Sequence, residues 1–137
     1  MKISTNHLSA AYLDLLNEAK AVMEKAYSPY SNIRVGAALL AKDQKIFVGC
    51  NVENAAYGNT ICAERSAVCN AVANGYRPGD FKAIAIVSNG ENFSPCGSCR
   101  QVLQEFGSNI TVIFEFDGEI NSMLLMELLP KGFPKKD

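Results

Sequence analysis

Three cysteines at the starts of two predicted helices constrain this chain more than any other feature. Cys96 and Cys99 form a Pro-Cys-x-x-Cys motif that begins one helix, and Cys62 begins an earlier one. This spacing lets two thiolates reach one ion, and the positive end of a helix dipole lowers the pKa of a thiol. Zinc prefers soft sulfur ligands in a tetrahedral arrangement. The sequence therefore predicts a zinc site where the two helices meet.

The number of thiolates decides whether such a site is structural or catalytic. Four would close the coordination sphere, whereas three leave one position for water. Cys69 follows Cys62 on the same helix and lies about 10 Å away along the helix axis, so it cannot share the ion. It is predicted to be a small buried side chain. Cys50 is the one credible fourth ligand, so a closed structural site stays an alternative.

Glu64 favours the catalytic alternative. It lies two residues after Cys62, in the first helical turn, beside the expected open position. A carboxylate there can take a proton from an ion-activated water and later deliver it to a leaving group. The simpler interpretation is that Glu64 only complements the helix dipole. Its coincidence with the cysteine motifs supports the catalytic role.

Two arginines closely follow predicted ligands. Three thiolates on Zn²⁺ leave a net negative charge, which weakens the ion as an acid. Arg65 and Arg100 are expected to donate to these thiolates and to withdraw part of that charge. The alternative is that both are ordinary exposed arginines.

Strands alternate with helices along the chain, which is typical of a layered α/β domain. The apolar pattern predicts helices at residues 12–26, 62–74, 97–106 and 123–129. It predicts strands at residues 35–41, 46–49, 83–87 and 110–116. The hairpin formed by the first two strands makes the sheet mixed. A single domain covering residues 1–137 is expected from the chain length.

Composition excludes some partners. The formal net charge is −1 and 20% of residues are charged, so the broad basic surface that attracts nucleic acid or anionic membranes is not expected. No apolar run approaches the length of a membrane span, and no signal-peptide pattern occurs at the start. The sequence predicts a cytoplasmic protein with neither a membrane nor a nucleic-acid partner.

The motifs together resemble the short, homotetrameric, zinc-dependent cytidine deaminases. Besides Cys-Ala-Glu at 62–64 and Pro-Cys-x-x-Cys at 95–99, the shared motifs are Ser-Pro-Tyr-Ser at 28–31, Val-Gly-Ala-Ala at 35–38, Gly-Cys-Asn-Val-Glu-Asn-Ala at 49–55 and Glu-Leu-Leu-Pro at 127–130. The resemblance covers nearly the whole chain. It implies a three-layer α-β-α fold with a mixed, roughly five-stranded sheet, one zinc per subunit, and active sites shared between subunits.

This resemblance also implies the reaction. Cytidine and 2′-deoxycytidine would be hydrolysed to uridine and 2′-deoxyuridine with release of ammonia, a step of pyrimidine salvage. Cys62, Cys96 and Cys99 would hold the zinc that activates a hydroxide, and Glu64 would shuttle the proton.

The substrate contacts are implied by the same resemblance. Asn51 and Glu53 would hydrogen-bond the ribose 3′-hydroxyl, and backbone groups near Ala63 and Ser94 would contact the pyrimidine edge. On residue type alone, the polar pair could equally be ordinary loop polarity.

Three apolar or aromatic positions complete the expected pocket. Tyr57 would lie at a subunit contact near the site, and Phe133 would stack on the base from a neighbouring subunit. Ile33 occupies the position where the family usually carries an aromatic residue. It can still cover the pyrimidine, but the ring–ring attraction of about 0.5–1.5 kcal/mol is lost.

Alternative functions are a blasticidin S deaminase, a polynucleotide-editing deaminase and a non-enzymatic zinc module. The Asn-x-Glu pair at 51–53 favours a nucleoside with ribose over the antibiotic. The adenosine branch of the editing enzymes normally has histidine where Cys62 stands, and the near-neutral charge also disfavours a polynucleotide. A structural module would need a fourth sulfur.

Overall fold

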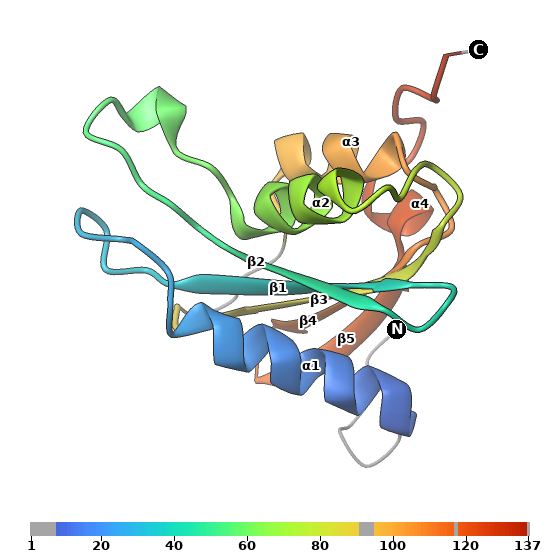
Figure 1. Cartoon of the computed structure of the whole chain (residues 1–137), viewed down its shortest axis with the longest axis horizontal. Coiled ribbons are helices and arrows are strands. Elements are labelled where there is room, and N and C mark those ends of the chain that lie inside the picture. The colour runs from blue at the N-terminus through green and yellow to red at the C-terminus, as the bar shows by residue number, and fades with distance from the viewer. Residues whose placement is uncertain (1–7, 91–94, 117, 137) are drawn as a thin grey trace.

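One mixed sheet of five strands, covered by helices on both faces, forms the centre of the molecule (Figure 1). The computed structural model describes residues 8–90, 95–116 and 118–136. The strands are β1 (Val35–Ala41), β2 (Ile46–Cys50), β3 (Phe81–Ser88), β4 (Thr111–Phe116) and β5 (Glu119–Leu124), in the order β2-β1-β3-β4-β5. β3 and β4 run parallel, and the other neighbouring strands are antiparallel.

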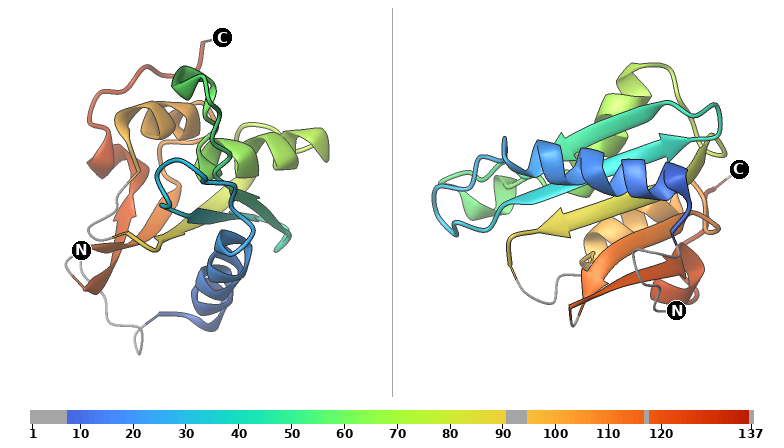
Figure 2. Two further views of the ribbon diagram at one scale, coloured as in Figure 1. Left: turned by 90° about the vertical axis from the view of Figure 1, so that its left-hand side faces the viewer. Right: turned by 90° about the horizontal axis from the view of Figure 1, so that it is seen from below.

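The helices are divided between the two faces of the sheet. One face carries α1 (Ala10–Met23), and the other carries α2 (Ala63–Ala73), α3 (Gly97–Gln104) and α4 (Leu125–Leu128). Figure 2 shows α1 lying across its face of the sheet. The predicted three-layer α/β fold with a mixed sheet is confirmed. No helix in the described part of the chain is long and apolar enough to cross a membrane.

The apolar core has two halves, one on each side of the sheet. In β1, Ala37 and Leu39 join the half under α2, whereas Ala38 and Leu40 join the half under α1. All seven residues of β1 are buried, as expected for a central strand that is covered on both faces. The sheet is therefore a rigid support for the first turns of α2 and α3.

Two segments lie side by side at one end of the sheet. Residues 24–34 follow α1, and residues 51–62 lead from β2 to α2 through the short 3₁₀-helix η2 (Tyr57–Asn59) (Figure 1). Tyr27 donates from its backbone nitrogen to Asn51 and pairs with Val52 in an isolated β-bridge. This pairing places the two segments next to the start of α2.

The first helix is shorter than the periodicity predicts. It ends at Met23 rather than near residue 26. After Met23, the backbone nitrogens of Lys25 and Ala26 donate to carbonyl oxygens three residues earlier, as in a 3₁₀ turn. Tyr27 then leaves the helix and pairs with residues 51–53. Apolar spacing did not reveal the end because Ala26 remains partly buried after the helix has stopped.

The last helix was also predicted too long, and β5 was not predicted as a strand. Met123 belongs to β5, where it pairs with Val112 of β4, and the helix covers only Leu125–Leu128. The polar Asn121 is buried in this strand, and its amide donates to the Glu119 carbonyl oxygen at 3.1 Å. A polar residue at an inward position hides the alternation from which strands are predicted.

Candidate metal centre and active site

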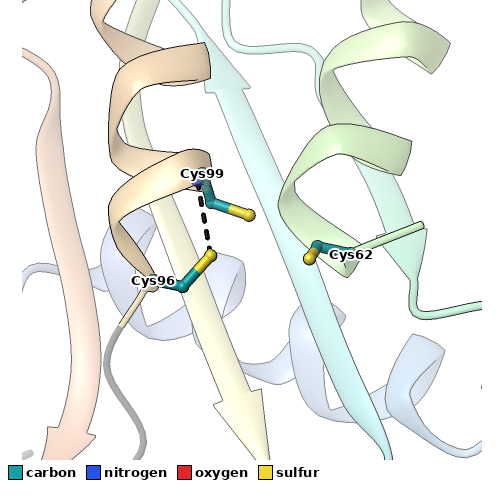
Figure 3. A group of neighbouring side chains, drawn as sticks. All are labelled: Cys62, Cys96 and Cys99. Atoms are coloured by element: carbon teal, nitrogen blue, oxygen red, sulfur yellow. Dashed lines mark hydrogen bonds between the residues drawn. The ribbon is translucent and has the colours of Figure 1, made fainter. Parts of the chain in front are cut away.

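The first turns of α2 and α3 bring three cysteines together. Cys62 is the N-cap of α2, Cys96 is the N-cap of α3, and Cys99 lies in the first turn of α3. Their Sγ atoms all lie within 4.8 Å of one another and point into the space between the helices (Figure 3). A tetrahedral zinc with Zn–S bonds of about 2.3 Å requires sulfurs roughly 3.8 Å apart. The three sulfurs therefore fit one ion.

The other two cysteines stand apart from this group. Among the described residues, no further histidine, cysteine or carboxylate joins it, and Cys50 lies outside it. Cys69 is exposed, so the prediction that it is buried was wrong. It follows Ala67 by two residues, which is more than half a helical turn, so it points away from the buried side of α2. Three sulfur ligands leave one coordination position for a water.

Arg65 contacts the metal group directly. Its Nη2 lies 3.7 Å from the Sγ of Cys62, within hydrogen-bond range for sulfur. A hydrogen bond with Cys99 and the Arg65 guanidinium lower the pKa of Cys62 to about 5, against the opposing effect of burial. Contact with Cys62, together with burial, raises the pKa of Cys99. Metal binding requires deprotonated thiols, so an arriving cation would displace the proton of Cys99.

Glu64 is a buried carboxyl group beside this metal group. It is 2% exposed, and it lines the same pocket as Cys62 and Cys96. Burial, and then the charge of Cys62, raise the pKa of the Glu64 carboxyl. A carboxyl group that holds a proton more readily than usual is suited to accept a proton and return it during a reaction.

The pocket has a volume of about 220 Å³. Its wall contains the metal-site residues together with polar and apolar side chains from residues 31–60. The lining residues are Ser31, Ile33, Val35, Asn51, Glu53, Tyr57, Thr60, Cys62, Ala63, Glu64 and Cys96. The structure therefore brings together two of the predicted metal ligands, the predicted proton shuttle and five of the predicted substrate contacts.

Asn51 and Glu53 are held by the backbone of the neighbouring segment. The Asn51 carboxamide accepts from Val35 N and donates to Ile33 O, both at 2.9 Å. Glu53 accepts from the backbone nitrogens of residues 30 and 31 and from the hydroxyl of Ser31. The Ser31 hydroxyl is the main cause of the lowered pKa of the Glu53 carboxyl. Both side chains are thus fixed in the pocket wall.

Comparison with known proteins identifies the family. Residues 10–115 match the model of the cytidine and deoxycytidylate deaminase zinc-binding region. This chain belongs to the cytidine and deoxycytidylate deaminase family. All three cysteines of the metal group lie in the matched region and are positioned to bind its zinc.

Relatives of this deaminase family are similar over most of the chain. A cytidine deaminase of Sporosarcina psychrophila is 48% identical over 126 residues, 90% of this chain and 91% of the relative. A cytidine deaminase of Halalkalibacterium halodurans is 44% identical over 90% of this chain and 94% of its own length. The crystal structure of the cytidine deaminase from Burkholderia pseudomallei has a TM-score of 0.84 and 47% identity, covering 92% of this chain and 100% of that one.

One predicted contact of this deaminase, Phe133, lies away from the pocket of the single chain. Ser94 is outside the described residues. The side chain of Phe133 is 80% exposed, while its backbone exchanges two hydrogen bonds with Gln101, at 3.0 and 3.1 Å. Within one chain, Phe133 is therefore held in place without contributing to the pocket.

Arg100 forms hydrogen bonds with two backbone carbonyl oxygens. Its Nε donates to Pro95 O at 2.6 Å, and its Nη1 donates to Leu128 O at 2.7 Å. These two hydrogen bonds connect Pro95, which precedes Cys96, with the end of α4. The sequence did not indicate this role, because Leu128 is distant along the chain and offers only a backbone carbonyl.

Ser31 and Thr60 also line the pocket, and residue type alone did not single them out. The Oγ1 of Thr60 is buried and has no hydrogen-bond partner among the described residues. Ser31 is part of the Ser-Pro-Tyr-Ser motif, and that motif was the one signal that could have indicated it.

Gly49 controls how closely β2 approaches the first turn of α2. A Cβ at this position would lie 2.3 Å from Ala67 N and 2.6 Å from Ala63 O, so the helix would have to move. Gly49→Ala is expected to destabilise the fold by about 1–3 kcal/mol. It should also weaken zinc binding, because Ala63 follows the Cys62 ligand. Chelator competition for zinc and thermal unfolding measure the two effects.

Gly36→Ala is the matched control for this prediction. Its Cβ would lie 2.1 Å from Ala19 O, on the opposite face of the sheet. The control should lose similar stability but keep the zinc affinity of the folded protein. Equal loss of zinc affinity in both variants would show that the Gly49 contact has no special role at the metal site.

Proposed function

We propose that this chain catalyses the hydrolytic deamination of cytidine and 2′-deoxycytidine to uridine and 2′-deoxyuridine, with release of ammonia. Membership of a zinc-binding deaminase family makes the chain a zinc-dependent hydrolase. The observation that carries the proposal is the shared pocket, in which Glu64 lies beside the three-cysteine group.

Proton transfer in this reaction is assigned to Glu64. When bound, zinc supplies a Lewis acid that lowers the pKa of a water in its open position to about 7. Glu64 would accept one proton of that water and transfer it to N3 of the pyrimidine as the hydroxyl adds to C4. It would then take the second proton from this hydroxyl and deliver it to the amine, so that the C4 carbonyl forms as the C4–N bond breaks and ammonia leaves. Its burial supports this role, because it raises the pKa and lets the group hold a proton between these steps.

The unused hydrogen-bonding capacity of Asn51 and Glu53 supports a ribose contact. Asn51 has already used its carbonyl oxygen and one amide hydrogen, which leaves one donor. Glu53 accepts three hydrogen bonds out of roughly four, which leaves one acceptor position. One donor and one acceptor match a single hydroxyl, assigned here to the 3′-hydroxyl. This pair would then accept both ribo- and deoxyribonucleosides.

Ile33 is proposed to cover one face of the pyrimidine, and Ile33→Phe tests this. The side chain lines the pocket and is 46% exposed, so a larger ring has room to extend. The variant should lower KM for cytidine by roughly 2- to 10-fold, since an aromatic pair adds about 0.5–1.5 kcal/mol. Steady-state kinetics measure the effect. An unchanged or higher KM would contradict the proposed stacking position.

We also propose a cytoplasmic homotetramer in which Phe133 reaches the pocket of a neighbouring subunit. Phe133 and Tyr57 are 80% and 69% exposed, and the backbone of Phe133 is fixed by Gln101. Sedimentation should give four times the mass of one chain. Phe133→Ala should raise KM for cytidine without changing that mass. A monomer with full activity would contradict the shared site.

A substrate comparison tests the proposed function. The purified protein is incubated separately with cytidine, 2′-deoxycytidine, blasticidin S and a cytosine-containing single-stranded oligonucleotide, and ammonia and product are measured. Turnover of the two nucleosides, well above the other compounds, is the expected result. Preferred turnover of blasticidin S or of the oligonucleotide would replace the proposal with the corresponding alternative.

A further inference from the structure

We infer that Ser31 is a positioning residue through which the pocket recognises the 3′-hydroxyl of the nucleoside. The inference rests on the proposed function and specifies how its sugar contact is built. Ser31 lines the pocket beside Glu53, and it is the residue that contacts both oxygens of the Glu53 carboxylate.

The contacts of Ser31 hold the carboxylate at two points. Its backbone nitrogen donates to Glu53 Oε1 at 3.1 Å, and its hydroxyl donates to Oε2. The backbone nitrogen of Tyr30 also donates to Oε1, at 2.9 Å. Oε1 thus has two backbone donors, whereas the hydroxyl of Ser31 is the hydrogen-bond donor described for Oε2. A single side-chain atom therefore fixes the oxygen that remains available to a sugar hydroxyl.

The same hydroxyl shapes the turn that carries Ile33. The backbone nitrogen of Ile33 donates to Ser31 Oγ at 3.0 Å, across Asn32, whose φ is +61°. A non-glycine residue in this left-handed region requires support from its surroundings. Ser31 Oγ therefore links the sugar-binding carboxylate to the residue that faces the base.

Loss of the hydroxyl should weaken recognition of the sugar selectively. Without it, Oε2 loses the donor that the described residues provide, and the carboxylate can turn away from the position that a 3′-hydroxyl requires. A hydrogen bond to a charged group accounts for roughly a 10- to 100-fold change in binding. A nucleoside without a 3′-hydroxyl never makes this contact, so its affinity should hardly depend on Ser31.

The test compares cytidine with 3′-deoxycytidine in the unaltered protein and in three variants. Ser31→Ala removes the hydroxyl, and Ser31→Thr retains it. Ser9→Ala is a matched control, because Ser9 Oγ also accepts a backbone N–H, at 3.2 Å, but caps α1 on the opposite side of the sheet. Thermal unfolding confirms that each variant is folded.

In Ser31→Ala, kcat/KM for cytidine is expected to fall by about 10- to 100-fold, mainly because KM rises. For 3′-deoxycytidine, kcat/KM should fall by less than about 3-fold. The preference for the 3′-hydroxyl should persist in Ser31→Thr and Ser9→Ala. Equal losses for both substrates in Ser31→Ala would reveal a general structural role and overturn the inference. An unchanged preference would also overturn it.

Titration with the products uridine and 3′-deoxyuridine provides a measurement that does not require turnover. If the unaltered protein binds uridine but does not convert cytidine, the proposed reaction is wrong. A selective loss of uridine affinity in Ser31→Ala would then still support the role of Ser31 in sugar recognition. If the unaltered protein binds both products equally, the inference is wrong, whatever the activity of the protein.

Discussion

Replacement of Glu64 by glutamine is expected to lower kcat for cytidine by about 10²–10⁴-fold or more, because an amide cannot accept and return the proton. The fold should persist, since glutamine has nearly the same shape and fills the same buried position. Burial raises the pKa of Glu64 in the folded protein, so its ionised form opposes folding above the unfolded pKa. The melting temperature at pH 7 should therefore be unchanged or higher.

Three measurements separate catalysis from structure in this variant: kcat from ultraviolet absorbance, zinc per chain, and thermal unfolding. Glu127→Gln is the matched control, since Glu127 also lies in a first helical turn and accepts from Leu124 N, but outside the pocket. The control should retain full kcat. If Glu64→Gln retained kcat within tenfold while remaining folded, another group would have to be the proton shuttle.

Replacement of Cys99 by alanine should remove zinc and activity together. Cys99 is fully buried and supplies one of the three sulfurs, so two thiolates would remain. Loss of partners that only orient metal ligands costs roughly 10- to 100-fold in affinity, and loss of a direct ligand should cost more. Metal binding also stabilises the fold, so the melting temperature of the zinc-loaded protein should fall.

Cys69→Ala is the matched control for Cys99→Ala, because it removes a cysteine from α2 that is not one of the proposed ligands. Cys69 is exposed and lies outside the metal group, so its loss should leave zinc content, kcat and melting temperature unchanged. Zinc is measured by competition with a coloured chelator. Full zinc affinity in Cys99→Ala, or loss of zinc in Cys69→Ala, would contradict the assigned ligand set.

The starts of α2 and α3 could be predicted from the sequence, because the residues that begin a helix are close together along the chain. Cys62 and Cys96 were placed at helix starts by the residues around them, and both are N-caps. The burial of β1 on both faces agrees with its continuous apolar run. These features depend on residues that are close together along the chain.

The features that the sequence did not reveal depend on distant partners. Arg100 binds a carbonyl at the end of α4, and Met123 joins a strand that needs β4 as its neighbour. Ser31 and Glu53 meet because two loops pair at the end of the sheet. Backbone partners leave no pattern in residue type, so contacts of this kind become visible only in the folded chain.

The most direct test of the zinc-dependent deaminase is one ultraviolet assay with cytidine. Activity is measured on the purified protein, after removal of zinc by a chelator, and after return of one equivalent of zinc. Conversion of cytidine to uridine and ammonia, its loss with the metal, and its recovery on zinc addition are predicted. Full activity in the zinc-free protein, or no conversion of cytidine by the zinc-loaded protein, would contradict the account.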